Sequence, residues 1–160
     1  MREIQINTVL HVYTGLDELP NKVAQLFEKA REARGKAYAP YSNFTVGAAI
    51  LLDNGEIITG SNQENASFPS GLCAERTAIY YAGAQFPSNL IKAMAIVAGS
   101  KNHKTTTPIP PCGACRQAIA EYEIKQNQPI EIYFMGEEGE IVKSNSLKNL
   151  LPLVFDKNVL

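Results

Sequence analysis

The spacing of apolar residues changes between the helical and the strand period along the chain. Over residues 17–34, apolar side chains recur every three or four positions, which predicts an amphipathic helix ending at Gly35. Two apolar runs follow, at 44–52 and 57–60, joined through Asp53-Asn54-Gly55. Asn-Gly between two apolar runs is typical of a β-hairpin.

The second half alternates helix and strand patterns. We expect helices at 72–84 and 112–124, strands at 92–97, 129–135 and 140–143, and a helical turn at 146–151. Residues 1–14 are a candidate for one further short strand. Two successive strand–helix–strand units imply parallel strands with right-handed crossovers. The pattern therefore predicts an α/β fold: a mixed sheet of about five strands with helices on both faces.

Composition indicates one compact domain, residues 1–160, with 1–16 as an N-terminal extension. The chain is 45% hydrophobic and has no internal repeat or obvious linker. Its net charge is −1 without a run of lysine or arginine, so we expect no nucleic-acid partner. No apolar run approaches the roughly 20 residues that span a bilayer, and the N-terminus lacks a signal-peptide core. We therefore expect no membrane association and a cytoplasmic location.

The chain contains only three cysteines, Cys73, Cys112 and Cys115. An odd number without a secretory signal argues against a disulfide framework. Cys112 and Cys115 form a C-x-x-C at the start of a predicted helix, a spacing shared by redox dithiols and by half of a zinc site. Cys73 begins the preceding helix. If both helices lie on one face of the sheet, the three sulfurs converge.

Three thiols without a clear fourth ligand favour a catalytic over a structural zinc site. Structural zinc takes four protein ligands, whereas catalytic zinc takes three and leaves a position for water. His11 and His103 lie in polar surroundings, where we expect surface histidines. Glu75, two residues after Cys73, is expected to transfer protons without binding the metal. Arg76 is expected to offset the negative charge of the three thiolates.

Two motifs resemble the paired signature of the cytidine deaminases. They are Cys73-Ala74-Glu75 and Pro111-Cys112-Gly113-Ala114-Cys115-Arg116-Gln117. A cysteine as the first ligand resembles the small homotetrameric zinc-dependent members, and not the histidine branch that includes many nucleic-acid editors. Segments 41–49 and 62–69 resemble that family's nucleoside-binding segments, and 150–155 resembles its C-terminal segment. The likeness covers residues 20–156.

The resemblance implies a cytidine deaminase-like α-β-α sandwich holding one Zn²⁺ per subunit through Cys73, Cys112 and Cys115. It implies hydrolytic deamination of cytidine, and of 2′-deoxycytidine, to uridine or deoxyuridine plus ammonia in pyrimidine salvage, with Glu75 as the catalytic acid–base. It further implies substrate-binding roles for Phe44 (against the pyrimidine), Asn62 and Glu64 (ribose hydroxyls), Ala74 (base, through its backbone) and Phe155 (in a neighbouring subunit's site). It also implies a homotetramer with sites shared between subunits.

Four alternative functions are less favoured. Deamination of another aminopyrimidine, such as the nucleoside antibiotic blasticidin, is disfavoured by the ribose-binding segment. C-to-U editing of nucleic acid is disfavoured by the near-zero net charge. A structural zinc module lacks its fourth ligand, and a thioredoxin-like function leaves Cys73 and Glu75 without a role. Two segments depart from the family pattern: the N-terminal extension and residues 101–110 are both longer than expected.

Overall fold

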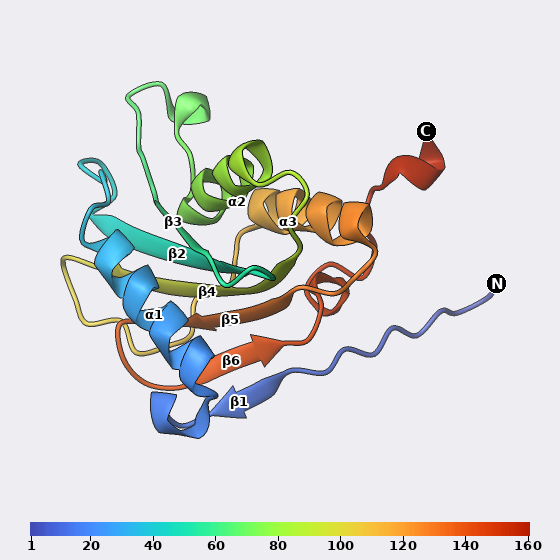
Figure 1. The fold of residues 1–160 in the computed structure, drawn as a ribbon, viewed down its shortest axis with the longest axis horizontal. Coiled ribbons are helices and arrows are strands. Elements are labelled where there is room, and N and C mark those ends of the chain that lie inside the picture. Colours follow the sequence, from blue (N-terminus) through green and yellow to red (C-terminus); the bar gives the residue numbers. More distant parts are fainter.

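A computed structural model describes all residues, 1–160, and Figure 1 shows its nine helices and strands. In chain order they are β1 (His11–Tyr13), α1 (Asn21–Arg34), β2 (Phe44–Leu52), β3 (Ile57–Ser61), α2 (Ala74–Gln85), β4 (Ile91–Ser100), α3 (Gly113–Gln126), β5 (Glu131–Met135) and β6 (Ile141–Ser144). Four short 3-10 turns are η1 (Leu16–Glu18), η2 (Phe68–Ser70), η3 (Leu147–Asn149) and η4 (Lys157–Val159). No helix combines the length and the apolar composition needed to cross a bilayer.

The strands form one mixed sheet in the order β1-β6-β5-β4-β2-β3. The pair β4–β5 is parallel, and the other neighbouring pairs are antiparallel. The predicted α/β fold with a mixed sheet is therefore confirmed. The strand count is six instead of about five, because residues 11–13 of the N-terminal extension pair with residues 141–143 of β6.

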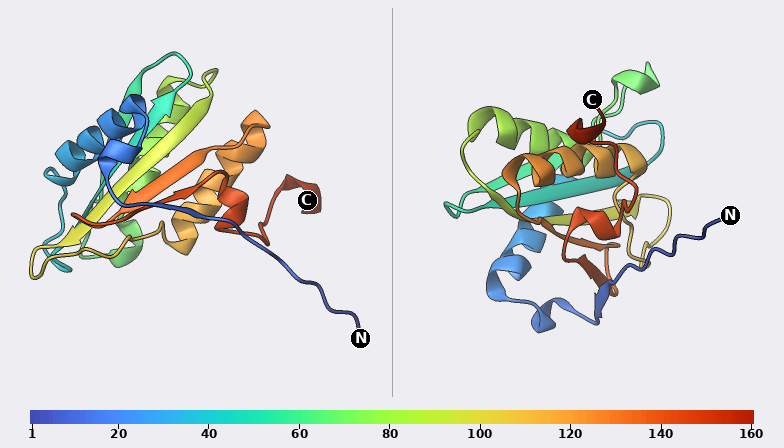
Figure 2. Two further views of the ribbon diagram at one scale, coloured as in Figure 1. Left: turned by 90° about the horizontal axis from the view of Figure 1, so that it is seen from below. Right: turned by 90° about the vertical axis from the view of Figure 1, so that its right-hand side faces the viewer.

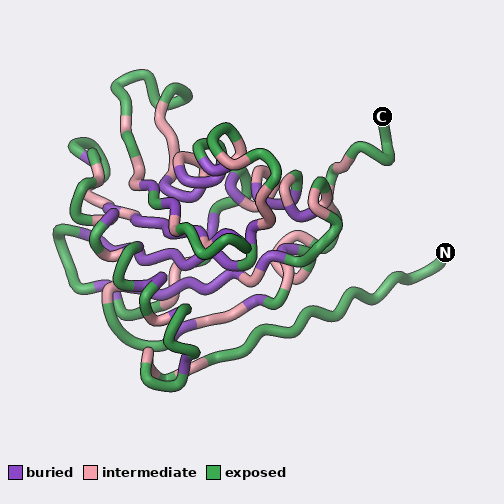
Figure 3. Tube along the Cα trace, in the orientation of Figure 1, coloured by how far each residue is buried: buried purple, intermediate pink, exposed green.

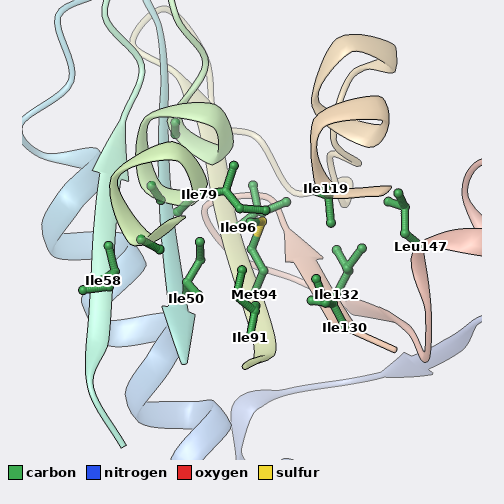
Figure 4. Close-up of a cluster of buried hydrophobic side chains, with 14 of the residues drawn as sticks. Ile50, Ile58, Ile79, Ile91, Met94, Ile96, Ile119, Ile130, Ile132 and Leu147 are labelled. Atoms are coloured by element: carbon green, nitrogen blue, oxygen red, sulfur yellow. The ribbon is translucent and has the colours of Figure 1, made fainter. Parts of the chain in front are cut away.

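Helices cover both faces of the sheet, as expected. Figure 2 shows α1 on one face and α2 with α3 on the other. Strand β4 is buried from both sides (Figure 3). Its Met94 and Ile96 pack with Ile79 of α2 and Ile119 of α3 (Figure 4), whereas the alternate residues of β4 pack against α1. Burial on both faces explains why this strand is a continuous apolar run.

Helix α1 begins four residues later than the apolar pattern predicts. The structure places a separate 3-10 turn at Leu16–Glu18, and the helix starts at Asn21. Pro20 lies between them, and proline disfavours helical backbone at the preceding residue. Leu19 is accordingly extended, with ψ of 153°. The proline thus divides the predicted helix in two.

The connection between β3 and β4 decides where α2 and α3 begin. Strands β3 and β4 are both antiparallel to β2, which lies between them, so they run in the same direction. The first strand–helix–strand unit therefore skips one strand, whereas β4 and β5 are direct neighbours. Because α2 follows β3 and α3 follows β4 on the same face, both helices begin at the same edge of the sheet.

Candidate metal centre and adjoining cleft

The three cysteine thiols meet at the N-termini of α2 and α3. Cys73 is the N-cap of α2, Cys112 is the N-cap of α3, and Cys115 lies buried in the first turn of α3. Their sulfur atoms all lie within 4.8 Å of one another, and Cys73 Sγ is 3.9 Å from Cys112 Sγ. Tetrahedral zinc with Zn–S bonds of about 2.3 Å separates two sulfurs by roughly 3.8 Å. The Cys73–Cys112 pair has this spacing, and the cluster as a whole is compact enough to hold one ion.

The electrostatic surroundings of the cluster favour the thiolate form of Cys73. The pKa of Cys73 is lowered to about 5, chiefly by a hydrogen bond from the Cys115 thiol, against the opposing effect of burial. The Arg76 guanidinium lowers it further, with Nη2 3.7 Å from Cys73 Sγ. The pKa of Cys115 is raised, because its thiol donates a hydrogen bond to Cys73 and because it is buried. Two helix N-termini add positive partial charge, so the cluster can hold a divalent cation.

Glu75 lies in the first turn of α2 with only 5% of its surface exposed. Burial raises the pKa of its carboxyl group, and the negative charge of Cys73 acts in the same direction. The Nε atom of the neighbouring Arg76 is buried without a hydrogen-bond partner. A buried carboxyl group that readily holds a proton, next to a candidate metal ligand, has the chemistry of a general acid–base.

Gly60 of β3 allows the first turn of α2 to rest on the sheet. A Cβ atom at Gly60 would lie 2.5 Å from the carbonyl oxygen of Ala74 and 2.6 Å from the amide nitrogen of Ala78. Both distances are shorter than a Cβ atom tolerates, so no residue with a side chain fits at this position. Only glycine therefore permits this approach, which sets the positions of Cys73 and Glu75.

A cleft of about 500 Å³ adjoins the metal cluster. Among its lining residues are Asn62, Glu64, Leu72, Cys73 and Arg76. The structure thus brings the two residues expected at the ribose into one cavity with a predicted metal ligand. That cavity is large enough for a small organic molecule.

Asn62 and Glu64 are held by hydrogen bonds to the segment that begins β2. Asn62 Oδ1 accepts from the Val46 amide at 2.7 Å, and its Nδ2 donates to the Phe44 carbonyl oxygen at 2.9 Å. Glu64 accepts from the Tyr41 amide at 2.9 Å, and from both the amide and the hydroxyl of Ser42. The Ser42 hydroxyl is the main cause of a lowered pKa at Glu64. Both side chains are therefore fixed in place, and Glu64 is a carboxylate at neutral pH.

The other expected substrate contacts do not line this cleft within one chain. Phe44 is half-buried at the start of β2, and Ala74 is fully buried as the first residue of α2. Phe155 is 61% exposed, and its carbonyl oxygen accepts a hydrogen bond from Gln117 Nε2 at 2.8 Å. None of the three is among the residues that line the cleft.

Neither histidine joins the metal cluster. His11 is exposed in β1, where its Nε2 lies 3.2 Å from Nδ2 of Asn145. His103 is exposed in the loop after β4. Both are surface histidines, as the sequence predicts.

Arg116, within the second cysteine motif, is a positioning residue whose role the sequence pattern does not indicate. Its Nε donates to the Pro111 carbonyl oxygen at 2.8 Å, and its Nη1 donates to the Leu150 carbonyl oxygen at 3.0 Å. It thereby links the residue before Cys112 to the C-terminal segment. Its place directly after Cys115 in the motif is the only sequence signal, because both acceptors are backbone atoms and one lies 34 residues away.

Comparison with known proteins places most of the chain within one enzyme family. Residues 20–128 match the family described as the cytidine and deoxycytidylate deaminase zinc-binding region. The cytidine deaminase of Sporosarcina psychrophila is 40% identical over 135 residues, which cover 84% of this chain and 92% of that protein. The cytidine deaminase of Halalkalibacterium halodurans is 41% identical over 130 residues, covering 81% and 91% respectively.

Solved structures agree with the sequence relatives. The crystal structure of cytidine deaminase from Burkholderia pseudomallei superposes with a TM-score of 0.70 at 40% identity, over 82% of this chain and 97% of that one. That from Mycobacterium tuberculosis gives a TM-score of 0.63 at 31% identity, over 82% and 95%. The similarity therefore extends to the fold that carries the cysteine cluster.

Proposed function

The chain belongs to the cytidine and deoxycytidylate deaminase family, and on this premise we propose that it is a zinc-dependent hydrolase converting cytidine to uridine and ammonia. We extend the proposal to 2′-deoxycytidine, which yields deoxyuridine. The observation that carries it is the convergence of three thiols beside the buried carboxyl group of Glu75, at the side of an open cleft.

We propose that Cys73, Cys112 and Cys115 hold one zinc ion per subunit. Bound there, zinc supplies a Lewis acid that makes a water molecule acidic enough to react near neutral pH. Three thiolates would donate electron density to the metal, which makes a bound water molecule less acidic. Arg76 and the N-termini of α2 and α3 offset the surplus negative charge.

Glu75 moves the protons of the reaction in this proposal. Its carboxylate takes a proton from the attacking water and delivers it to N3 of the pyrimidine while a C4–O bond forms. It then carries the proton of the new C4 hydroxyl to the exocyclic amine. The C4–N bond breaks as the C4–O bond becomes a carbonyl, and ammonia leaves. Burial supports this role, because a raised pKa lets one group both accept and return a proton near neutral pH.

Asn62 and Glu64 retain hydrogen-bonding capacity for ribose. The amide nitrogen of Asn62 donates one of its two hydrogens to Phe44 and keeps the other. A carboxylate has about four acceptor positions, and the bonds from Tyr41 and Ser42 use three of those of Glu64. A hydroxyl can donate to Glu64 and accept from Asn62, so we infer that a ribose hydroxyl binds there.

We further propose that the site is completed in a homotetramer. Phe44 would pack against the pyrimidine, the Ala74 backbone would contact the base, and Phe155 would enter a neighbouring subunit's site. The exposure of Phe155 supports the last role, because an exposed aromatic side chain is available to a second subunit.

We also propose that residues 1–160 form one catalytic domain with an extension at 1–16. The three free thiols favour a reducing compartment, so we place the enzyme in the cytoplasm. Salvage of pyrimidine nucleosides is the expected physiological role.

Metal analysis beside an ultraviolet assay tests the proposal. We expect about one zinc per chain and conversion of cytidine to uridine that a chelator abolishes and zinc restores. Purified protein that lacks zinc, or zinc-loaded protein that leaves cytidine unchanged, would contradict it.

A further inference from the structure

The N-terminal arm, residues 1–10, extends away from the folded body. It runs outward past the edge of the sheet, and all ten residues are exposed (Figures 1, 2 and 3). Its backbone makes no hydrogen bond to the rest of the chain. It precedes residues 20–128, the region shared with the family. Ile4, Ile6 and Leu10 are 43 to 72% exposed, so this segment presents several large aliphatic side chains to solvent.

The arm has the alternating pattern of a half-buried β-strand. Successive side chains of a strand point to opposite faces, so residues two apart share a face. The even-numbered positions from the arm into β1 are Ile4, Ile6, Thr8, Leu10 and Val12. On the odd-numbered face, Val9 is the only aliphatic residue between Glu3 and His11. The arm is therefore an amphipathic strand without a partner.

The arm leads into a strand with a free edge. β1 is the end strand of the sheet and pairs on one side only, with β6. Val12 is opposite Val142, which packs against the core beneath α2 and α3, whereas Tyr13 packs against the core beneath α1. The apolar side of the arm thus continues the α2–α3 face of the sheet. A free edge beside an apolar strand is a template for pairing with another strand.

We propose that the arm pairs antiparallel with β1 and the arm of a second copy of this chain, with Thr8 on the two-fold axis. In that register Ile4 lies opposite Val12 and Ile6 lies opposite Leu10. All four apolar residues of the even-numbered face then meet an apolar partner, which is the pairing that stabilises a sheet. Because a two-fold interface joins the same surface of both subunits, one self-complementary strand suffices.

Shifting the axis by one residue is less favourable. An axis at Asn7 would place Ile6 opposite Thr8 and Val12 opposite Arg2. Two apolar residues would then lose their apolar partners, and a charge would be set against Val12. The sequence therefore selects the register with Thr8 on the axis.

Charge complementarity at the ends of the pairing supports a second copy as the partner. With Thr8 on the axis, Arg2 of each copy lies opposite Thr14 of the other. The amide and hydroxyl of Thr14 donate to the carboxylate of Glu18 at 3.0 and 2.7 Å. Asp17 and Glu18 make this turn acidic, so it receives the positively charged side chain of Arg2 from the other copy.

Disulfide trapping of Thr8→Cys tests the arrangement. Directly opposed residues of antiparallel strands have Cα atoms about 4.5–5.5 Å apart, within reach of a disulfide. Under mild oxidation of zinc-loaded protein, we expect Thr8→Cys to give a covalent dimer on a non-reducing gel. Asn7→Cys is the matched control, because its thiol would lie opposite Val9 and not opposite itself. The unmodified chain controls for the three native thiols.

The proposal is overturned if Thr8→Cys forms the covalent dimer no faster than Asn7→Cys does. That result is also expected if the arm binds its own chain or another protein. A second pair of variants tests the register in the Thr8→Cys background. Ile6→Asp sets a carboxylate against Leu10 and should lower the dimer yield roughly tenfold. Gln5→Asp adds the same charge on the opposite face and should leave it unchanged. Equal yields from both variants would refute the register.

These variants lie outside the folded body, so their melting temperatures should match that of the unmodified chain. The trapping experiment detects contact between two chains and does not measure enzyme activity. Its failure would therefore leave the proposed deaminase activity standing, and an inactive enzyme that still forms the Thr8→Cys dimer would leave the arm pairing standing.

Discussion

Arg116 donates a hydrogen bond from Nε to the carbonyl oxygen of Pro111 at 2.8 Å, one turn back along its own helix start. Its other contact, from Nη1 to Leu150, reaches the C-terminal segment at 3.0 Å. Pro111 immediately precedes Cys112. The Arg116 guanidinium therefore holds both the backbone next to the cysteine cluster and the segment that leads to Phe155. The metal site is consequently coupled to the C-terminus by charge-assisted bonds to backbone oxygens.

Replacing Arg116 by methionine should loosen the metal site. Hydrogen bonds to a charged group are worth about 1.5–3 kcal/mol each, so we expect the loss of both in Arg116→Met to cost roughly 3–6 kcal/mol of stability. We also expect faster zinc loss to a chelator, measured with a colorimetric dye. Lys29→Met is the control, because Lys29 forms an exposed pair with Glu32 of little value. Equal zinc-loss rates for both variants would contradict this role.

Glu75→Gln should separate metal binding from turnover. The amide keeps the shape of the side chain but cannot accept and return a proton, so kcat should fall by at least about a thousandfold. Zinc content should stay at the unmodified level, because Glu75 is not a member of the thiol cluster. Glu121→Gln, on the exposed surface of α3, is the control and should remain active. An active Glu75→Gln enzyme would refute the catalytic assignment.

Glu64 should disfavour phosphorylated substrates. A carboxylate at the ribose repels a 5′-phosphate, so we expect kcat/KM to be higher for cytidine than for its monophosphate. Glu64→Gln should lower kcat/KM for cytidine and also reduce this preference. Ser42→Ala is the matched control, because it removes the hydroxyl bonded to Glu64 and leaves the charge in place. If Glu64→Gln leaves the preference unchanged, charge at this position does not set it.

Gly60→Ala should displace the first turn of α2. The added methyl group would meet backbone atoms of Ala74 and Ala78 at distances no side chain tolerates. Overpacking of this kind costs about 1–3 kcal/mol, and we expect weaker zinc retention because Cys73 moves with the turn. Gly113→Ala is the control within the metal motif, since a Cβ there meets nothing within 4 Å. Similar stability and zinc content for both variants would contradict this prediction.

Glu137 should contribute stability that is lost in acid. The Arg34 guanidinium, 2.7 Å away, and the Thr105 amide hold the pKa of this carboxyl group below its ordinary value of 4.5. The folded state binds this proton less readily than the unfolded chain does. The contribution of Glu137 to the free energy of unfolding is therefore fully present above the ordinary pKa of 4.5. It disappears as the pH falls through the lowered pKa.

We therefore expect the unmodified chain to lose more stability than Glu137→Gln between about pH 7 and about pH 3.5, measured by urea unfolding. Glu138→Gln controls for charge, because Glu138 pairs with Lys104 on the exposed surface. Equal pH dependence of the unmodified chain and Glu137→Gln would show that the Arg34 contact contributes nothing.

The local elements of this protein follow from short-range properties of its sequence. The hairpin between β2 and β3 depends on Asn54-Gly55, and Gly55 adopts the positive φ of 90° that such a turn requires. The spacing of Cys112 and Cys115 places both at the start of one helix. These features were predictable because each depends on neighbours a few residues away. The divided start of α1 at Pro20 was missed, although the proline was visible.

Tertiary structure alone decided which distant residues meet. Cys73 reaches Cys112 because the crossovers from β3 to β4 and from β4 to β5 move in the same direction across the sheet, so α2 and α3 lie on one face. The partners of Asn62 and the Leu150 partner of Arg116 are backbone groups of remote segments, which carry no side-chain signature in the sequence. Periodicity and turn chemistry act over a few residues, whereas these contacts depend on how whole elements pack. The sequence therefore determined the ligands and the elements that carry them, and the packing of those elements determined the site.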